Sequence, residues 1–156
     1  LVLVKGRWMN TTQHVKLPLY KYLTEGGERR VMVRDDGKAS HTIFRLLARW
    51  PEMSLLEAQL KTGRTHQIRV HLAHLGFPIL GDEKYGDFTL NKSLKRDGLK
   101  RMALHAWRMA FRHPLTAAEL ECVSPLPEGI GNYIATVGAE KSREFTAENF
   151  ESILNQ

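Results

Sequence analysis

The sequence predicts an α+β fold, a mostly antiparallel mixed sheet with helices packed on it. Residues 28–34, 42–50 and 54–60 alternate apolar and polar side chains as strands do, and turn residues separate them. The segment 65–75 instead repeats its apolar residues at helical spacing. With 156 residues, 42% of them hydrophobic, the chain can form one compact domain with its own core.

The first residues, 1–8, read LVLVKGRW and predict a buried strand because the run is apolar at nearly every position. No cap or turn precedes this run, so we expect the sequence to be a fragment of a longer protein. A second apolar piece, 15–19, contains Pro18, which favours a sheet edge or an extended loop.

The alternating runs should form neighbouring strands of one sheet. Asp36-Gly37 is a hairpin turn signal that would join residues 28–34 to residues 42–50. Pro51-Glu52 turns the chain again toward residues 54–60. This last run also contains good helix formers, but its short length and its strand neighbours favour a strand.

One short helix is expected in the middle of the chain. Ile68, Leu72 and Leu75 fall on one apolar stripe, Thr65 is the expected N-cap, and a Gly-x-Pro sequence after Leu75 ends the element. The remaining faces carry a dense set of polar side chains, namely His66, Gln67, Arg69, His71 and His74. Cationic residues precede the helix, where free backbone N–H groups favour an anion such as phosphate.

The rest of the chain alternates between loops and short elements. Residues 78–86 predict a loop, and the basic segment 87–101 predicts an exposed insertion. Residues 118–123 predict a strand with Leu120 and Cys122 facing inward, and a helix is expected from Glu128. Thr146 is a candidate N-cap of a last helix, with Phe145 and Phe150 as a hydrophobic staple.

The charge distribution indicates a polyanionic partner. Residues 1–113 hold 21 Lys and Arg against 10 Asp and Glu, whereas residues 114–156 hold 2 against 7. A strongly basic body suits RNA, although many basic domains bind none. No apolar run is as long as a membrane span, and the single cysteine is typical of a reducing cytoplasm, so we expect a cytoplasmic protein with no membrane contact.

Three stretches carry a family resemblance. TGRTHQIRVHLAHLGFPILGDEKYG, residues 62–86, resembles the signature of the RluA-type pseudouridine synthases, which modify ribosomal and transfer RNA. GERRVMVRDDGKASHTIFRLLARW, residues 27–50, resembles the same family, particularly the RluC-like enzymes that act on large-subunit ribosomal RNA. MALHAWRMAFRHP, residues 102–114, resembles its later LHA…HP pattern.

The resemblance implies an isomerase that converts specific uridines to pseudouridine without a metal or organic cofactor. The family's nucleophile is an Asp in an HRLDxxTSG-type motif, which this sequence does not contain. Its catalytic Tyr would precede Leu1, and none of the tyrosines present matches that position. Residues 1–156 therefore resemble the C-terminal part of the catalytic domain, which we expect to be inactive alone and monomeric.

Arg69 is the catalytic residue that carries over. Its place in HQIR matches the family arginine that pairs with the nucleophilic Asp, and a guanidinium can hold a carboxylate in a fixed bidentate geometry. Candidate RNA contacts are the basic and aromatic residues around this motif and in the insertion, namely Lys61, Arg64, Thr65, His66, Lys84, Tyr85, Lys92, Lys95 and Arg96. Packing under the loop is an equally good interpretation of Tyr85.

Two other functions stay open at this point. The missing Asp permits a noncatalytic RNA-binding module. His66, His71 and His74 permit a metal-dependent hydrolase, although their spacing is not HExxH and no cysteine cluster accompanies them. We therefore expect no metal site, and we interpret the sequence as a pseudouridine synthase acting on large-subunit (23S) ribosomal RNA.

Overall fold

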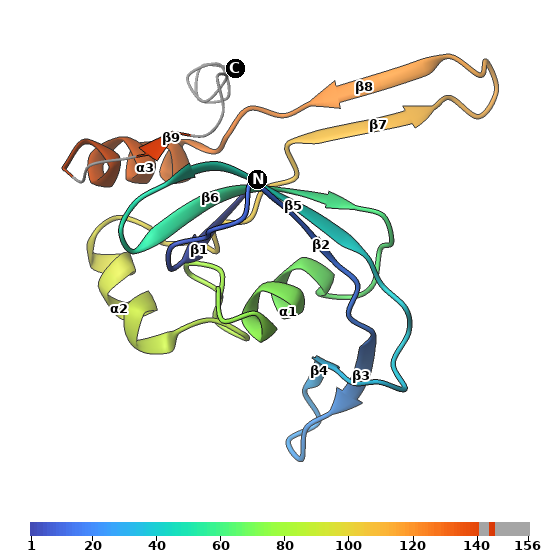
Figure 1. The fold of residues 1–156 in the computed structure, drawn as a ribbon, viewed down its shortest axis with the longest axis horizontal. Coiled ribbons are helices and arrows are strands. Elements are labelled where there is room, and N and C mark those ends of the chain that lie inside the picture. Colours follow the sequence, from blue (N-terminus) through green and yellow to red (C-terminus); the bar gives the residue numbers. More distant parts are fainter. Residues whose placement is uncertain (141–143, 146–156) are drawn as a thin grey trace.

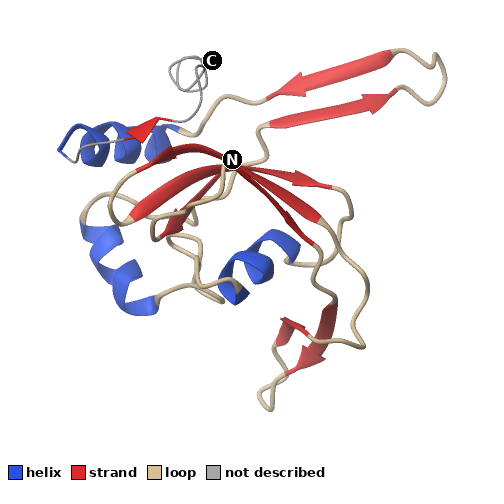
Figure 2. Cartoon of the chain, in the orientation of Figure 1, coloured by secondary structure: helices blue, strands red, loops and turns tan. Residues whose placement is uncertain are grey.

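The computed structural model describes residues 1–140 and 144–145, which form a central antiparallel sheet, two separate hairpins and three helices (Figure 1, Figure 2). The strands of this part are β1 Val2–Lys5, β2 Thr12–Val15, β3 Leu19–Leu23, β4 Arg29–Val33, β5 Thr42–Arg49, β6 Met53–Leu60, β7 Arg108–Arg112, β8 Glu119–Val123 and β9 Glu144–Phe145. Its helices are α1 Gln67–His74, α2 Phe88–Arg96 and α3 Glu128–Glu140. The α+β class predicted from the sequence is confirmed.

The central sheet has the strand order β1-β6-β5-β2, with β9 paired to β5. Its two faces are both buried, which explains why β1 is apolar at nearly every position. Leu3 belongs to a core cluster with Ile134 of α3, whereas Val4 belongs to a second cluster with Leu72 of α1. Figure 1 shows α3 and α1 on opposite sides of the sheet.

The alternation predicted for residues 42–50 holds only in part. A bulge interrupts the pairing of β5 with β6 between Leu46 and Ala48. Leu46, Leu47 and Ala48 are consequently all buried, although strict alternation would expose Leu47 beside Arg45. The extra residue lets β5 supply side chains to both core clusters.

The sequence predicted that the turn at Asp36-Gly37 pairs residues 28–34 with residues 42–50, and this pairing is wrong. β4 pairs with β3, and we call these two strands the arm hairpin, residues 19–33. The turn instead brings the chain back to β3, where Lys38 N donates to Leu19 O at 2.8 Å and Leu19 N donates to Lys38 O at 2.9 Å. Turn chemistry is local and does not specify which strand pairs next.

The segment 87–101 is not the exposed insertion that the sequence predicts. Asp87 accepts a hydrogen bond from Leu90 N and thereby caps α2, and Leu94 of this helix is buried in the core cluster that includes Leu3. The prediction was based on the many Lys and Arg residues of this segment. It overlooked Leu90 and Leu94, which are apolar and lie one helical turn apart.

The β7–β8 hairpin corrects the prediction for Cys122. β8 covers the expected strand, but all of its residues are exposed, Leu120 and Cys122 included. α3 begins at Glu128 as predicted. The helix predicted from Thr146 lies outside the described residues. Among the described residues, the helices lack the length and the apolar character that a membrane span requires.

Candidate functional site

Helix α1 starts differently from the prediction. His66, not Thr65, is the N-cap, and it has a left-handed backbone with φ of 54° and no capping side chain. The loop before the helix is held instead by Gln67, whose Oε1 accepts from Arg64 N at 2.9 Å and from Thr62 Oγ1 at 2.8 Å. Gly76, with φ of 82°, ends the element as predicted. A non-glycine residue in the conformation of His66 is uncommon and marks a constrained site.

Arg69 forms a bidentate ion pair within the chain. Its Nε lies 2.8 Å from Asp82 Oδ2, and its Nη2 lies 2.8 Å from Asp82 Oδ1. The Asp82 side chain is only 1% exposed and that of Arg69 is 18% exposed, so the pair is largely shielded from water. Paired N–H groups on a carboxylate give both strength and a fixed orientation.

The surroundings keep Asp82 ionised. Burial alone would raise the pKa of Asp82, but the hydrogen bond from Arg69 and those from the backbone of Tyr85 and Lys84 outweigh it, and the pKa is lowered. The pKa of Arg69 is raised, because its hydrogen bond to Asp82 outweighs the cost of burial. Asn91 of α2 holds the same loop, since its Nδ2 donates to Asp82 O at 2.8 Å.

This partner was not anticipated from the sequence. The family resemblance implies that Arg69 pairs with an Asp absent from this chain, and Asp82 takes only the Nε and Nη2 edge of the guanidinium. Asp82 does not use the Nη1 group or the second Nη2 hydrogen, which are further donors of the guanidinium. Pairing with an upstream Asp therefore stays a prediction. The sequence did not single out Asp82, because Gly81-Asp82 suggests only a turn.

Tyr85 connects the Arg69 site to the arm hairpin. Its hydroxyl accepts from Val31 N at 3.0 Å and lies 2.8 Å from His66 Nδ1. The Arg69 guanidinium carbon stands 5.0 Å from the centre of the Tyr85 ring, within cation–π range. Burial, followed by the charges of Arg69 and Lys84, lowers the pKa of His66.

Lys84 also contacts the arm hairpin. Its Nζ donates to Arg29 O at 3.0 Å and pairs with Glu28 at 2.8 Å, and its carbonyl accepts from Arg30 Nη1 at 3.2 Å. The loop 82–86 thus joins α1 to β4 through Lys84 and Tyr85. Packing of Tyr85 under the loop, one of the two interpretations from the sequence, fits these contacts, and contact of either residue with RNA stays a prediction.

The other predicted RNA contacts are exposed on two elements. Lys61, Arg64 and Thr65 lie on the loop before α1, and Lys92, Lys95 and Arg96 lie on α2. Among these side chains, Lys95 Nζ pairs with Glu83 at 2.6 Å and Arg64 Nε donates to Ala39 O at 3.1 Å. The two groups come from different parts of the fold (Figure 1).

The three histidines of the α1 region have different environments. His66 contacts Tyr85, His74 is exposed, and His71 is completely buried. His71 Nε2 lies 2.9 Å from Ser40 Oγ and its Nδ1 lies 3.0 Å from Thr42 Oγ1. Burial lowers the pKa of His71. Within residues 1–140 and 144–145, no cluster of His, Cys, Asp or Glu is arranged to hold a metal ion.

Comparison with known proteins identifies the class of this fold. A family model described as RNA pseudouridylate synthase matches residues 1–74, from β1 to the end of α1. A human protein named RNA Pseudouridylate Synthase Domain Containing 1 has the same fold, with a TM-score of 0.73 and 23% identity over 99% of this chain and 62% of its own. The human Domain Containing 4 protein has a TM-score of 0.67 and 23% identity, over 94% of this chain and 62% of its own.

Curated relatives agree with this class. The protein named ribosomal large subunit pseudouridine synthase C from Haemophilus ducreyi is 42% identical over 141 residues, 90% of this chain and 44% of the relative. The protein of the same name from Escherichia coli K12 is 39% identical over 83% of this chain and 41% of its own length. The chain belongs to the RluA-type pseudouridine synthase family and spans less than half the length of these relatives.

Proposed function

We propose that the protein containing this chain isomerises uridines to pseudouridine in large-subunit ribosomal RNA, and that residues 1–156 form the C-terminal part of its catalytic domain. The observation that carries the proposal is the 42% identity, over 90% of the chain, to a protein named ribosomal large subunit pseudouridine synthase C. The excess of basic residues in 1–113 supports an RNA partner. A monomer acting in the cytoplasm fits this role.

The proposed reaction is an isomerisation within one nucleotide. The bond between ribose C1′ and uracil N1 breaks, a bond forms between C1′ and uracil C5, and the hydrogen of C5 is lost while N1 gains a proton. The uridine must leave the base stack to be reached. A carboxylate at C1′ supplies the nucleophile or stabilises the developing cation, as in other glycosyl chemistry. Because no electrons enter or leave the nucleotide, the reaction needs no redox cofactor.

Arg69 is proposed to hold that carboxylate, which an upstream Asp would supply. Asp82 fixes one edge of the guanidinium at 2.8 Å, so the remaining N–H groups keep a constant direction. The Tyr85 ring lies against the Arg69 guanidinium and restricts its movement. The upstream Asp would meet a preoriented donor rather than a flexible side chain, and the charge of Arg69 would keep it ionised and nucleophilic.

Tritium release from RNA labelled at C5 of uracil tests the proposal directly. The full-length protein, made from the complete coding sequence, should release tritium from a large-subunit ribosomal RNA transcript. Residues 1–156 alone should release none, because the HRLDxxTSG-type Asp is not in this segment. Turnover by the segment alone would show that the catalytic carboxylate has been assigned to the wrong place.

A noncatalytic RNA-binding protein is the alternative outcome of the same assay. If the full-length protein binds the transcript but releases no tritium, the family similarity reflects RNA binding without catalysis. The upstream coding sequence gives a second check, since an HRLD-type motif there would supply the nucleophile.

A further inference from the structure

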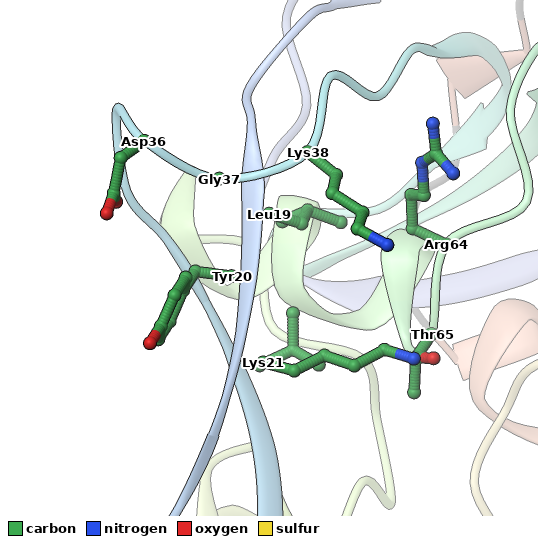
Figure 3. A pocket seen from close by; sticks show the side chains of 9 residues that line it. Leu19, Tyr20, Lys21, Asp36, Gly37, Lys38, Arg64 and Thr65 are labelled. Carbon is green, nitrogen blue, oxygen red and sulfur yellow. The ribbon is translucent and has the colours of Figure 1, made fainter.

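A pocket lies at the root of the arm hairpin, outside the Arg69 site. It has a volume of about 280 Å³ and lies between β3, β4, the turn 36–38 and the loop before α1 (Figure 3). Leu19 and Val31, which are 4% and 5% exposed, give it an apolar floor. Sequence patterns do not predict that these segments meet. The structure brings them together by pairing Leu19 of β3 with Lys38.

Three cations surround this pocket. Lys21, Lys38 and Arg64 line it, and Figure 3 shows the two lysine side chains extending toward the side where Thr65 and Arg64 lie. Within the described residues, Lys21 and Lys38 have no acidic partner, and the Arg64 guanidinium donates to the carbonyl of Ala39. Three positive charges without a counter-charge favour an anionic ligand.

The acidic residue of the pocket does not neutralise these cations. The Asp36 carboxylate pairs with Arg34, and Arg34 in turn stacks over the Tyr20 ring at 3.1 Å. Figure 3 shows Asp36 and Tyr20 on the other side of the arm hairpin from the tip of Lys21.

The backbone geometry makes the pocket a built feature rather than a chance gap. A Cβ atom at Gly37 would lie 2.6 Å from the carbonyl carbon of Leu19 and 2.8 Å from Arg34 O. Only glycine permits this close approach, which sets Lys38 beside β3. Val31 links the pocket to the Arg69 site, since its side chain forms the floor while its N–H binds Tyr85.

We propose that this pocket binds a backbone phosphate of the RNA substrate, with Lys21, Lys38 and Arg64 as its cations and the apolar floor beneath the same nucleotide. The inference rests on the proposed function for its choice of RNA. Lys21 and Lys38 thereby become part of the substrate-binding surface. The pocket fixes the position of the RNA strand relative to the site of reaction. Such contacts position RNA and carry no sequence information.

The test measures binding of the full-length protein to a large-subunit ribosomal RNA transcript at several salt concentrations. The double variant Lys21→Ala/Lys38→Ala should bind more weakly, and the slope of log K against log salt should fall by about one for each phosphate that the variant no longer neutralises. The matched control is Arg108→Ala/Arg112→Ala, which removes the same charge from exposed residues of β7, outside both the pocket and the basic segment 87–101. Lys21→Arg/Lys38→Arg should retain the slope of the wild type.

The outcomes separate this inference from the proposed function. Equal affinity and slope for the pocket variant and the Arg108→Ala/Arg112→Ala control would overturn the pocket, even if the wild type releases tritium. A reduced slope for the pocket variant alone, in a protein that releases no tritium, would support the pocket and overturn the enzyme. A pocket variant whose affinity and slope both match those of the wild type would also overturn the pocket.

Discussion

Arg69 and Asp82 form a bidentate pair between helix α1 and the loop that follows it, with both N–O distances at 2.8 Å. The carboxylate is almost completely buried and also accepts the backbone N–H groups of Lys84 and Tyr85. One acidic side chain thus organises the loop and orients the arginine that the family resemblance assigns to catalysis. The structural role of the pair can therefore be tested separately from the catalytic role proposed for Arg69.

Replacing Arg69 should affect rate more than RNA affinity. In the full-length protein, Arg69→Lys keeps the charge but loses the planar fork, so the single-turnover rate should fall while the fold is retained. Arg69→Ala also leaves Asp82 buried without its partner, which typically costs about 3–5 kcal/mol of stability. Tritium release and RNA binding are the measurements. A rate near that of the wild type with collapsed affinity would instead make Arg69 a phosphate contact.

Asp82→Asn should lower stability and make it less sensitive to acid. The pKa of Asp82 is lowered in the folded protein from 3.8, so its contribution is fully present above that value and is lost as the pH falls through the folded pKa. The variant should be less stable than the wild type by about 3 kcal/mol at neutral pH, and the difference should shrink below pH about 4. Urea unfolding at several pH values gives the comparison. Asp35→Asn is the control, because Asp35 is an exposed aspartate. A gap that stayed constant into acid would contradict the assignment.

Local patterns predicted the elements of this fold better than their partners. Apolar periodicity and the Gly-x-Pro ending located α1, and alternation located β5 and β6. The pairing of β4 with β3 was missed because a turn signal at Asp36-Gly37 is equally compatible with either neighbour. Cys122 was predicted to be buried because alternation cannot tell whether a hairpin lies on the core, and β7–β8 does not.

The site shows the same limit. Arg69 came from its place in a family motif, whereas Asp82 is separated from it by 13 positions and its role depends on how the loop folds back onto α1. The buried contacts of His71 with Ser40 and Thr42 were likewise invisible, since they join residues about 30 positions apart. Long-range polar contacts of this kind require the fold to be known.

His71 should make the fold sensitive to mild acid. Burial lowers its pKa from 6.5, so the unfolded chain takes up a proton at a higher pH than the folded chain does. Its contribution to stability is therefore complete above pH 6.5 and is lost as the pH falls toward the folded pKa. Thermal unfolding midpoints from pH about 8 to about 5 should decline for the wild type and decline less for His71→Gln. His74→Gln, at an exposed position, should decline as the wild type does, and a similar decline in all three proteins would exclude His71 as the cause.

The exposed cations of α2 provide a second test of the RNA-binding surface. Lys92, Lys95 and Arg96 all face solvent, so reversing their charges should leave the fold intact. If this surface follows RNA phosphates, the triple change to Glu should weaken binding at low salt and flatten the salt dependence. Binding to the transcript between about 50 and 200 mM salt measures the effect. An unchanged slope would mean that these side chains are merely solvated.

Gly37→Ala should damage the root of the arm hairpin and, with it, RNA binding. The added methyl group would lie 2.6 Å from the Leu19 carbonyl carbon and 2.8 Å from Arg34 O, so the backbone must shift. Overpacking of this kind typically costs about 1–3 kcal/mol.

Gly63→Ala is the matched control, because a Cβ at Gly63 meets nothing within 4 Å and the residue lies on the loop before α1. Urea unfolding should show a loss of stability for Gly37→Ala but little change for Gly63→Ala. The salt dependence of RNA binding should fall with the first variant only, because the shift carries Lys38 away from Lys21 while both charges remain. If Gly37→Ala lost stability but kept the wild-type salt dependence, the position of Lys38 would not matter for binding.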